Sequence, residues 1–247
     1  MSRLRLARFL ARAGVTSRRG AAELVASGRV AVNGSPPTGP GDPVDPAADR
    51  VTLDGRPLAV AALAWLALHK PPGYVTSRCA TPRHKSIFVL VPGASEATVA
   101  VGRLDVYSEG LLLLTTDGDA AHRLMHPRWQ VPRTYAVELA GTWGRAEEAA
   151  LARGVPVGEG SPVRPTRWHW RAGRDGGTLE LELREGRSRV VRRVAAALGL
   201  GVRRLVRVAY GPVVLGELPP GASRPLDVRE LAALYRAIGL ASPFLSR

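Results

Sequence analysis

One stretch of this sequence, GRLDVYSEGLLLLTTDG over residues 102–118, constrains the fold more than any other. Four consecutive leucines, Leu111 to Leu114, favour a strand that is covered on both faces of a sheet, because they show no alternation with polar residues. Val99 to Val101 predict a second short strand ahead of it. The connection between the two strands carries Asp105. An Asp in a glycine-containing loop is ordinarily a turn former, so spacing alone leaves its role open between a turn and chemistry.

Two short helices are predicted near the start of the chain. Apolar residues at helical spacing between Leu4 and Ala11 predict a basic helix that ends at Gly14. Ser17 is placed to cap a second helix that runs through Ala26.

Turn signals follow these helices. Asn33-Gly34 and Asp54-Gly55 each come directly after a short β-type run, and both dipeptides favour tight hairpin turns. Residues 35–46 are rich in Pro and Gly and predict a loop within or at the edge of the same module. The chain is long enough for a small domain followed by a large one. The domain boundaries that we expect are residues 1–60 and 61–247.

The larger domain alternates short apolar runs with Gly and Pro. The strands that we expect cover residues 66–69, 98–101, 111–115, 134–140, 163–170, 178–184, 204–208 and 212–215. The helices that we expect cover residues 84–91, 118–126, 144–153, 189–198 and 227–238. Strands outnumber helices without regular alternation, which favours a mixed α+β domain over a doubly wound parallel sheet.

The net charge of +14 is concentrated in two segments. Residues 1–34 hold seven Arg and one Glu, and residues 164–207 hold twelve Arg and four acids, so the two segments contribute +6 and +8. Such a concentration is typical of a surface that holds a polyanion, and nucleic acid is the partner we expect. All but two of the 35 basic residues are Arg. This skew suits phosphate recognition, but a compositional bias of the genome would also produce it.

Several other classes of protein are disfavoured. Cys79 is the only cysteine, so no intramolecular disulfide can form and a reducing compartment, the cytoplasm, is expected. No apolar run approaches the roughly 18 residues that span a membrane. The acid-free stretch from Arg3 to Arg19 has the composition of a transit peptide, but it continues into strand and turn signals. Neither a GxxxxGK loop nor a GxGxxG after a strand is present.

One histidine pair has the spacing of metal ligands. His122 and His126 stand at i and i+4, yet Pro127 follows directly, and neither an HExxH glutamate nor a cysteine cluster accompanies them. We expect no metal site and no organic cofactor.

Several motifs together resemble one known family. The GRLD string, HKPPGYVTS at residues 69–77 and EGRSRVVRR at residues 185–193 resemble the pseudouridine synthases of the ribosomal RNA branch, the RsuA/RluB type. FLARAGVTSRRGAAELVASGRVAVNG at residues 9–34 resembles the small RNA-binding domain first seen in a small-subunit ribosomal protein, which often precedes this family's catalytic domain. The resemblance covers nearly the whole chain. It implies a largely antiparallel sheet with the active site in a cleft across it.

The resemblance implies an RNA pseudouridine synthase, an isomerase that converts uridine to its C-glycoside. The Asp of GRLD is catalytic in that family and corresponds to Asp105, and Arg192 aligns with the Arg that pairs with it. A carboxylate suits this reaction because it can act as a nucleophile or as a base. The pattern alone gives Arg192 another interpretation, as part of the solvated face of an ordinary helix that buries Val191.

Two more residues acquire roles from the resemblance. Tyr135 corresponds to a Tyr that lies against the flipped uracil, where its ring can stack and its hydroxyl can move a proton. The pattern alone also allows a half-buried strand residue. Arg103 would fill the gap left when the uridine leaves the stack. Its alternative is a surface ion pair with a neighbour such as Glu109.

The EGRSRVVRR segment departs from the family pattern at two positions. Val190 stands where Gln is usual and Ser188 where Asn is usual, which leaves open the hydrogen bond that those side chains supply. Ser188 could cap the helix that begins there and direct backbone N–H groups toward an anion. The turn at residues 69–73 is assigned a structural or RNA-lining role.

The function that we expect is isomerisation of a specific uridine in ribosomal RNA, with the large subunit favoured over the small one, by a monomer in the cytoplasm. The alternative is a non-catalytic RNA-binding or ribosome-assembly factor, which would have the same charge distribution. A DNA-binding regulator would leave the larger domain unexplained. The arginines that we expect to contact RNA are Arg103, Arg3, Arg5, Arg8, Arg12, Arg18, Arg19, Arg29, Arg187 and Arg189.

Overall fold

The structure is a computed structural model that describes residues 3–244 of the chain. It divides into two compact units. The first runs up to Ala64 and also takes in Gly93–Val99 and Thr115–Gly118, and the remaining residues form the second. No helix within residues 3–244 is both long enough and apolar enough to cross a membrane.

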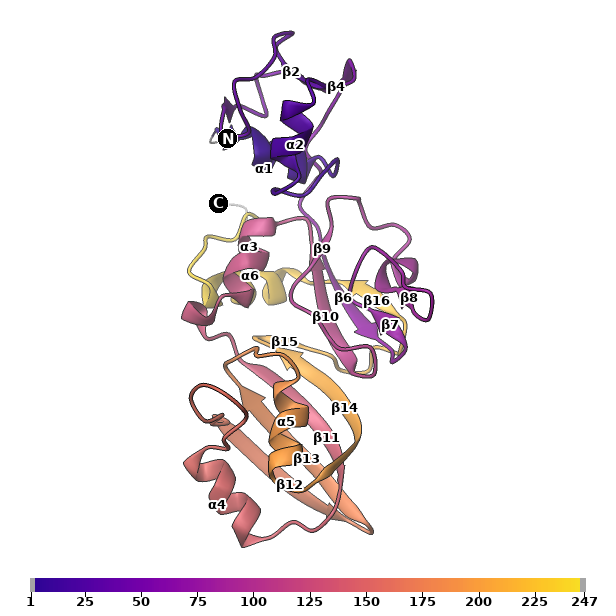
Figure 1. The fold of residues 1–247 in the computed structure, drawn as a ribbon, viewed down its shortest axis with the longest axis vertical. Helices are drawn as coiled ribbons and strands as arrows, with labels where there is room; N and C mark the ends of the chain where they lie inside the picture. The colour runs from indigo at the N-terminus through magenta and orange to yellow at the C-terminus, as the bar shows by residue number, and fades with distance from the viewer. Residues whose placement is uncertain (1–2, 245–247) are drawn as a thin grey trace. The chain divides into compact units, whose positions relative to one another are not determined.

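The first unit packs two short helices against small antiparallel strand pairs (Figure 1). Strand β1 pairs with β3, β2 with β4, and β4 with β5. Its core consists of Leu6, Phe9 and Leu10 together with Ala21, Val30, Val44 and Val51. The elements are β1 (Leu4–Arg5), α1 (Leu6–Arg12), α2 (Ala21–Ala26), β2 (Val30–Val32), β3 (Pro43–Val44), β4 (Val51–Leu53) and β5 (Arg56–Pro57).

Both tight turns in this unit are confirmed. Asn33 and Gly34 have φ values of 52° and 83°, and Asp54 and Gly55 have φ values of 51° and 77°. Two consecutive positive φ angles are typical of the turn that joins tightly paired antiparallel strands. The second of these turns connects β4 directly to β5.

Two details of this unit differ from expectation. Helix α2 begins at Ala21 with Gly20 as its N-cap and without a side-chain cap, and the Ser17 hydroxyl accepts a hydrogen bond from the Gly20 N–H at 3.1 Å in the turn ahead of the helix. The prediction that Ser17 caps this helix is therefore wrong. The loop predicted at residues 35–46 contains β3, because Val44 is buried and pairs with Leu4.

Nine strands form one sheet in the order β12-β13-β11-β14-β10-β6-β16, with β9 beside β10 and β15 beside β14 (Figure 1). The pairs β12/β13, β11/β13, β11/β14 and β16/β6 are antiparallel, whereas β10 and β14 are parallel. The expected mixed, largely antiparallel fold is confirmed. The strands are β6 (Trp65–Lys70), β9 (Val99–Ala100), β10 (Glu109–Thr115), β11 (Arg133–Ala140), β12 (Arg167–Gly173), β13 (Gly176–Leu183), β14 (Gly201–Tyr210), β15 (Val213–Val214) and β16 (Ser223–Pro225).

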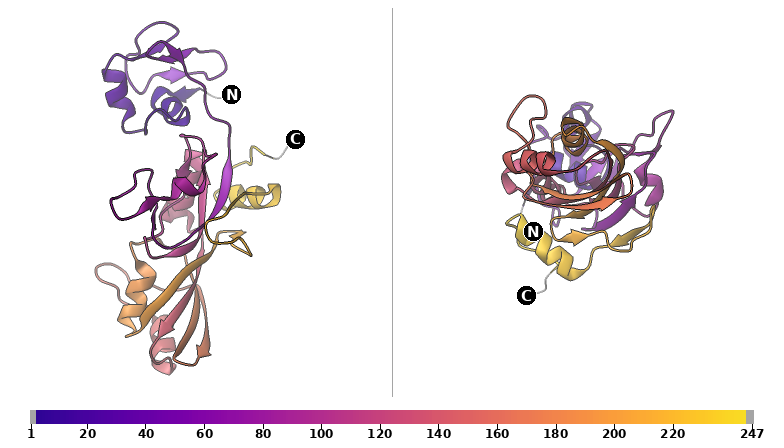
Figure 2. Two further views of the ribbon diagram at one scale, coloured as in Figure 1. Left: turned by 90° about the vertical axis from the view of Figure 1, so that its right-hand side faces the viewer. Right: turned by 90° about the horizontal axis from the view of Figure 1, so that it is seen from below.

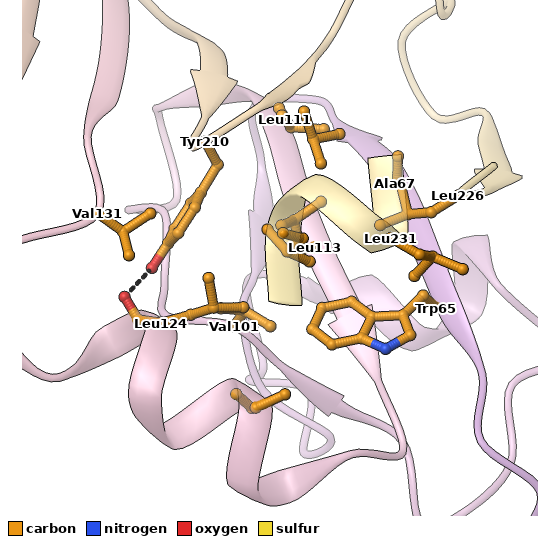
Figure 3. Close-up of a cluster of buried hydrophobic side chains, with 14 of the residues drawn as sticks. Trp65, Ala67, Val101, Leu111, Leu113, Leu124, Val131, Tyr210, Leu226 and Leu231 are labelled. Carbon is orange, nitrogen blue, oxygen red and sulfur yellow. Dashed lines mark hydrogen bonds between the residues drawn. The ribbon is translucent and has the colours of Figure 1, made fainter. Parts of the chain in front are cut away.

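Strand β10 is buried on both faces, as its leucine run predicts. All four leucines from Leu111 to Leu114 are fully buried. Leu111 and Leu113 pack with Trp65 and Tyr210 in one core cluster (Figure 3), where the Tyr210 hydroxyl donates to the Leu124 carbonyl at 2.9 Å.

A second core cluster lies between strands β11, β13 and β14 and helix α5, which runs along one face of these strands (Figures 1 and 2). Tyr135, Leu181 and Leu205 contribute from the strands, and Val191 and Val194 contribute from the helix. The helices are α3 (Gly118–Met125), α4 (Arg145–Arg153), α5 (Val190–Ala197) and α6 (Val228–Ala237), with a 3-10 turn η2 (Pro127–Trp129).

Residues 84–91 do not form the α-helix that we expected. Lys85–Ser86 forms strand β8, which pairs in parallel with β7 (Tyr74–Val75), and a short 3-10 helix η1 (Ile87–Leu90) follows. The Ser86 hydroxyl accepts from the Phe88 N–H at 3.1 Å. Strand pairing before this cap limits the helix to a single short turn.

The strand expected at residues 163–170 is displaced. Val163 forms a two-hydrogen-bond bridge with Val155, at 2.8 and 2.9 Å, away from the sheet. Pro165 follows, and a proline has no N–H to contribute to a strand ladder. Strand β12 consequently begins at Arg167.

Candidate active site

Asp105 lies half-buried in the loop that connects β9 to β10. Gly102 enters this loop with a φ of 79°, a conformation that glycine adopts readily. The Ser108 N–H donates to the Asp105 carbonyl at 3.0 Å and closes the turn. The prediction of a loop Asp between two strands is confirmed.

Thr76 braces the residue that precedes Asp105. Its hydroxyl donates to the Leu104 carbonyl at 2.9 Å and accepts from the Leu104 N–H at 3.2 Å. The Gly73 N–H donates to the Val106 carbonyl at 2.8 Å, on the other side of Asp105. The HKPPGYVTS segment therefore supports the loop structurally, in line with the role assigned to its turn.

Lys70 is fully buried beneath the same loop. The three hydrogens of its ammonium are shared among four backbone carbonyls at N···O distances of 2.8 to 3.2 Å. Burial lowers the pKa of Lys70 to about 8, against the opposing attraction of Asp105 and Glu109. The four carbonyls belong to Pro71, Asp105, Val106 and Ser108.

Helix α5 brings Arg192 to the same loop. The Arg192 Nη2 donates to the Tyr107 carbonyl at 3.1 Å and contacts the Ser108 hydroxyl at 3.5 Å. Arg192 is half-buried, so it does not belong to a purely solvated helix face. Its neighbour Arg193 donates to the Val157 carbonyl at 2.7 Å instead.

The start of α5 corrects one expectation. Its N-cap is Arg189, in the left-handed conformation with a φ of 53° and with no side-chain cap, so the prediction that Ser188 caps this helix is wrong. Arg189 occupies the N-cap position, so Ser188 lies one residue before the position from which a side chain could cap the helix. Val190 and Val191 are both buried in the cluster under the helix.

Tyr135 lies on β11, on the sheet face that α5 covers. It is buried among apolar residues of the second core cluster, and its backbone is paired with Arg207 across the neighbouring strand β14. The structure thus brings Tyr135 onto the same sheet face as α5, the helix that carries Arg192.

Arg207 is a residue of this region that the sequence did not single out. It is only 2% exposed, and its Nε donates to the Leu111 carbonyl at 2.7 Å. Its guanidinium lies 5.1 Å from the centre of the Tyr210 ring, and its Nη2 has no hydrogen-bond partner among residues 3–244. The sequence signal that could have identified Arg207 is its position inside the apolar run of β14, because Arg is almost never fully buried unless it is paired.

The alternative partner considered for Arg103 is engaged elsewhere. Glu109 is buried and forms an ion pair with Arg204, which also reaches Glu138 at 3.4 Å. The alternative role for Arg103, an ion pair with Glu109, is therefore wrong. Arg103 is exposed on the loop next to Asp105.

The other arginines expected to bind RNA differ in their surroundings. Most of those in the first unit are exposed, whereas Arg8 and Arg12 are half-buried. Arg29 forms a bidentate contact with Asp54 at 2.9 and 2.5 Å, and Arg187 pairs with Glu185. The exposed members are Arg3, Arg5, Arg18, Arg19, Arg29 and Arg189.

The histidine pair lies on α3 and just after it. The rings of His122 and His126 are 5.5 Å apart between centroids, and the His126 ring accepts from the Arg128 N–H at 3.1 Å. Within residues 3–244 no group of three or more His, Cys, Asp or Glu side chains could hold a metal ion.

Three separate segments therefore converge on one carboxylate-bearing loop. Lys70 holds its backbone from the end of β6, Thr76 from the bend after β7, and Arg192 from α5. A carboxylate on such a fixed loop is positioned to act as a nucleophile or a base without first having to be ordered.

Comparison with known proteins gives a consistent result over nearly the whole chain. Residues 64–197 match the family model described as RNA pseudouridylate synthase, and residues 4–51 match the S4 domain. The chain is 37% identical over 245 residues to a protein of Aquifex aeolicus named as an uncharacterized RNA pseudouridine synthase, with 97% of each chain covered.

Two further similarities extend this result. The chain is 38% identical to the ribosomal large subunit pseudouridine synthase B of Pseudomonas aeruginosa, over 96% of this chain and 63% of that protein. A crystal structure described as a pseudouridylate synthase superimposes with a TM-score of 0.65 and 31% identity, covering 94% of this chain and 99% of the other.

Proposed function

The chain belongs to the RNA pseudouridylate synthase family, to its RsuA/RluB type with an N-terminal S4 domain, and from this premise we propose that it isomerises a specific uridine of ribosomal RNA with Asp105 as the catalytic carboxylate. We favour RNA of the large subunit, because the similar protein of Pseudomonas aeruginosa is named for that subunit. The proposal includes a monomer that acts in the cytoplasm.

The proposed reaction is balanced without a co-reactant. The bond between N1 of the uracil and C1′ of the ribose breaks, the base rotates, and a bond forms between C5 and C1′. The hydrogen on C5 leaves as a proton, and N1 gains one. No electron or group donor is consumed, so the residues must supply a nucleophile or base, a route for the proton and a means of holding the base.

Asp105 is the proposed nucleophile or base. The observation that carries this assignment is the convergence of Lys70, Thr76 and Arg192 on its loop. Holding a reactive group in place before the substrate arrives lowers the entropy cost of the chemical step. Arg192 is the proposed partner of the carboxylate. It reaches the backbone of the same loop at the Tyr107 carbonyl, and a guanidinium brought beside a carboxylate favours the anion.

Tyr135 and Arg103 are the proposed contacts with the target nucleotide. A uridine inside a helix must leave the stack before an enzyme can act on its base. The ring of Tyr135 suits a stack on the extruded uracil, and its hydroxyl suits proton transfer. Arg103 is exposed beside Asp105, which suits it to fill the space that the base vacates.

The small N-terminal domain is the proposed anchor for the RNA. We set its boundary at residue 60 and that of the catalytic domain at residue 61, and we assign RNA contacts to the arginines of residues 1–34 together with Arg187 and Arg189. Their charge supports this assignment because phosphate contacts dominate the affinity of proteins for RNA. Arg29 and Arg187, which are paired with acids, would have to exchange those partners for phosphate.

The proposal is tested by incubating the purified protein with unmodified ribosomal RNA of both subunits and mapping pseudouridine at nucleotide resolution. We expect pseudouridine at one site, or at a few related sites, in the large-subunit RNA. Binding of both RNAs without any pseudouridine would instead support the non-catalytic assembly factor.

A further inference from the structure

Tyr107 displays an aromatic ring to solvent two residues after Asp105. Its side chain is 71% exposed, although both strands that flank the loop belong to the central sheet. This exposure leaves the ring of Tyr107 accessible to a ligand beside the candidate active site, and an aromatic ring offers a flat apolar surface for stacking.

The backbone that carries this ring is fixed. Lys70 holds the carbonyls on both sides of Tyr107, those of Val106 and Ser108, and Arg192 holds the carbonyl of Tyr107 itself at 3.1 Å. The exposed ring is therefore mounted on an ordered support. A ring presented in this way loses little conformational entropy when a flat ligand stacks on it.

One neighbour contacts the ring and leaves a face open. The rings of His84 and Tyr107 are 6.0 Å apart between centroids and nearly perpendicular, at 88°. In an edge-to-face pair the edge of one ring meets the face of the other. Whichever ring supplies the edge, at least one face of Tyr107 is not covered by His84.

The surrounding chain is basic. Residues 55–95 contain no Asp or Glu, and within them Arg78, Arg83 and Lys85 lie in or beside the turn that ends at His84. That turn is ordered by a hydrogen bond from the Thr81 N–H to the His84 carbonyl at 2.9 Å. Arg83 is exposed at its tip. An aromatic face beside an acid-free basic turn has the chemistry that binds single-stranded RNA.

We propose that Tyr107, supported by His84, is a stacking platform for a nucleobase that flanks the target uridine, with Arg83 binding a phosphate of the same strand. The inference rests on the proposed function, since it places the platform beside the reacting nucleotide. Extruding a base removes a stacking partner from each of its neighbours. An exposed protein ring next to the site restores one of these stacks.

The distances fit this arrangement. The Cα atoms of Asp105 and Tyr107 lie at most about 7 Å apart, the reach of two extended residues. The platform is two residues along the chain from Asp105, which places it within reach of a base beside the target uridine. Stacking on an aromatic ring tolerates any base. The platform would thus contribute affinity and position more than sequence selectivity.

The first test measures the affinity of the full chain for a single-stranded oligouridine, which requires no knowledge of the target. Tyr107→Ala is expected to weaken binding roughly 5- to 150-fold, the range for loss of one base stack. Tyr107→Phe is expected to restore most of the affinity, because it keeps the ring. Val214→Ala, which removes another exposed side chain from β15, is the matched control.

The second test uses a fragment of the modified RNA in which single nucleotides flanking the target uridine are made abasic. One abasic position should weaken binding to the wild-type chain and have little further effect on Tyr107→Ala, because both changes remove the same stack. Loss of the stack should raise KM more than it lowers the single-turnover rate at saturating RNA. Arg83→Ala should lower the slope of log K against log salt by about 0.7.

The platform is refuted if Tyr107→Ala binds oligouridine as tightly as wild type, or if every abasic position adds its full effect to that variant. These outcomes are separate from failure of the proposed function. A wild-type chain that forms no pseudouridine would refute the enzyme activity, while the oligouridine measurement would still decide whether Tyr107 stacks on RNA.

Discussion

Replacing Lys70 by Met tests whether one buried ammonium holds the loop of Asp105. Met keeps most of the side-chain volume and removes every donor. Two of the four carbonyls that Lys70 contacts keep another donor, since the Ser108 N–H reaches Asp105 and the Gly73 N–H reaches Val106. The loss of the Lys70 donors therefore affects mainly the other two carbonyls. These are the carbonyls of Pro71 and Ser108.

Two opposing terms set the expected change in stability. Two buried carbonyls that lose a donor cost about 1–3 kcal/mol each. Burial lowers the pKa of Lys70 from 10.5 to about 8, so removing the buried ammonium relieves about 3 kcal/mol. The terms are of similar size. We expect the net change in the free energy of unfolding to lie between a gain of about 1 kcal/mol and a loss of about 3 kcal/mol.

The chemical step should respond far more strongly than the stability. A catalytic group displaced by about 1 Å can lose about 100-fold in rate, and we expect a loss of that order in the single-turnover rate of Lys70→Met at saturating RNA. Single-turnover kinetics and thermal unfolding are measured side by side. Arg171→Met, at an exposed position of β12, is the matched control.

The pH dependence of the wild-type rate gives an independent readout. Because the folded-state pKa of Lys70, about 8, lies below the ordinary value of 10.5, the unfolded chain binds more protons between these values, and this group's contribution to stability rises with pH through that window. The neutral amine has fewer hydrogens for the four carbonyls, so the rate should fall as pH rises through about 8. A folded Lys70→Met with the wild-type rate and the same pH profile would refute the reasoning.

Three further predictions concern other parts of the molecule. Activity should survive EDTA, because the isomerisation consumes no electron or group donor; a loss that zinc restores while the RNA stays folded would instead implicate His122 and His126. Gly110→Ala should lower the free energy of unfolding by about 3 kcal/mol or more, because Gly110 has a φ of 106° and a Cβ there would lie 2.6 Å from the backbone nitrogen of Arg207. Gly118→Ala is the control and should change stability little, because a Cβ there meets open space. Equal effects of the two substitutions on thermal unfolding would contradict the packing argument. Deleting residues 1–60 should flatten the dependence of log K on log salt by roughly 0.7–0.9 per lost phosphate contact. The single-turnover rate of the folded remainder at saturating RNA should stay unchanged. An unchanged slope with a collapsed rate would show that these residues build the active site.

Much of the fold follows from local signals in the sequence. The leucines of β10 predict a strand buried on both faces because no polar residue alternates with them, and all four are fully buried. Asn33-Gly34 and Asp54-Gly55 predict turns because both residues of each pair tolerate positive φ, and both turns are present. These elements are determined by neighbouring residues alone.

The elements that differ from the sequence-based expectation depend on pairing partners that are distant in the sequence. Residues 84–91 do not form the expected helix because Lys85–Ser86 pairs with residues eleven positions upstream, in β7. Val163 leaves the sheet because it pairs with Val155. Neither pairing has a sequence signal stronger than the helical or strand pattern that it overrides.

The same distinction holds for the site. The resemblance to the family identifies Asp105 and Arg192, and the structure brings Arg192 to the loop that carries Asp105. The roles of Lys70 and Arg207 depend on carbonyls more than thirty residues away in the chain. No spacing rule links them, so only the folded structure reveals the support that they give.

The proposed catalytic role of Asp105 is tested most directly by the single-turnover rate of Asp105→Asn on the mapped RNA target. The substitution keeps the size of the side chain and removes the charge, and Asp175→Asn, in the exposed turn between β12 and β13, controls for the loss of one negative charge elsewhere. We expect no detectable pseudouridine from Asp105→Asn, RNA affinity within a few fold of wild type, and full activity from Asp175→Asn. A wild-type single-turnover rate in Asp105→Asn would contradict the account.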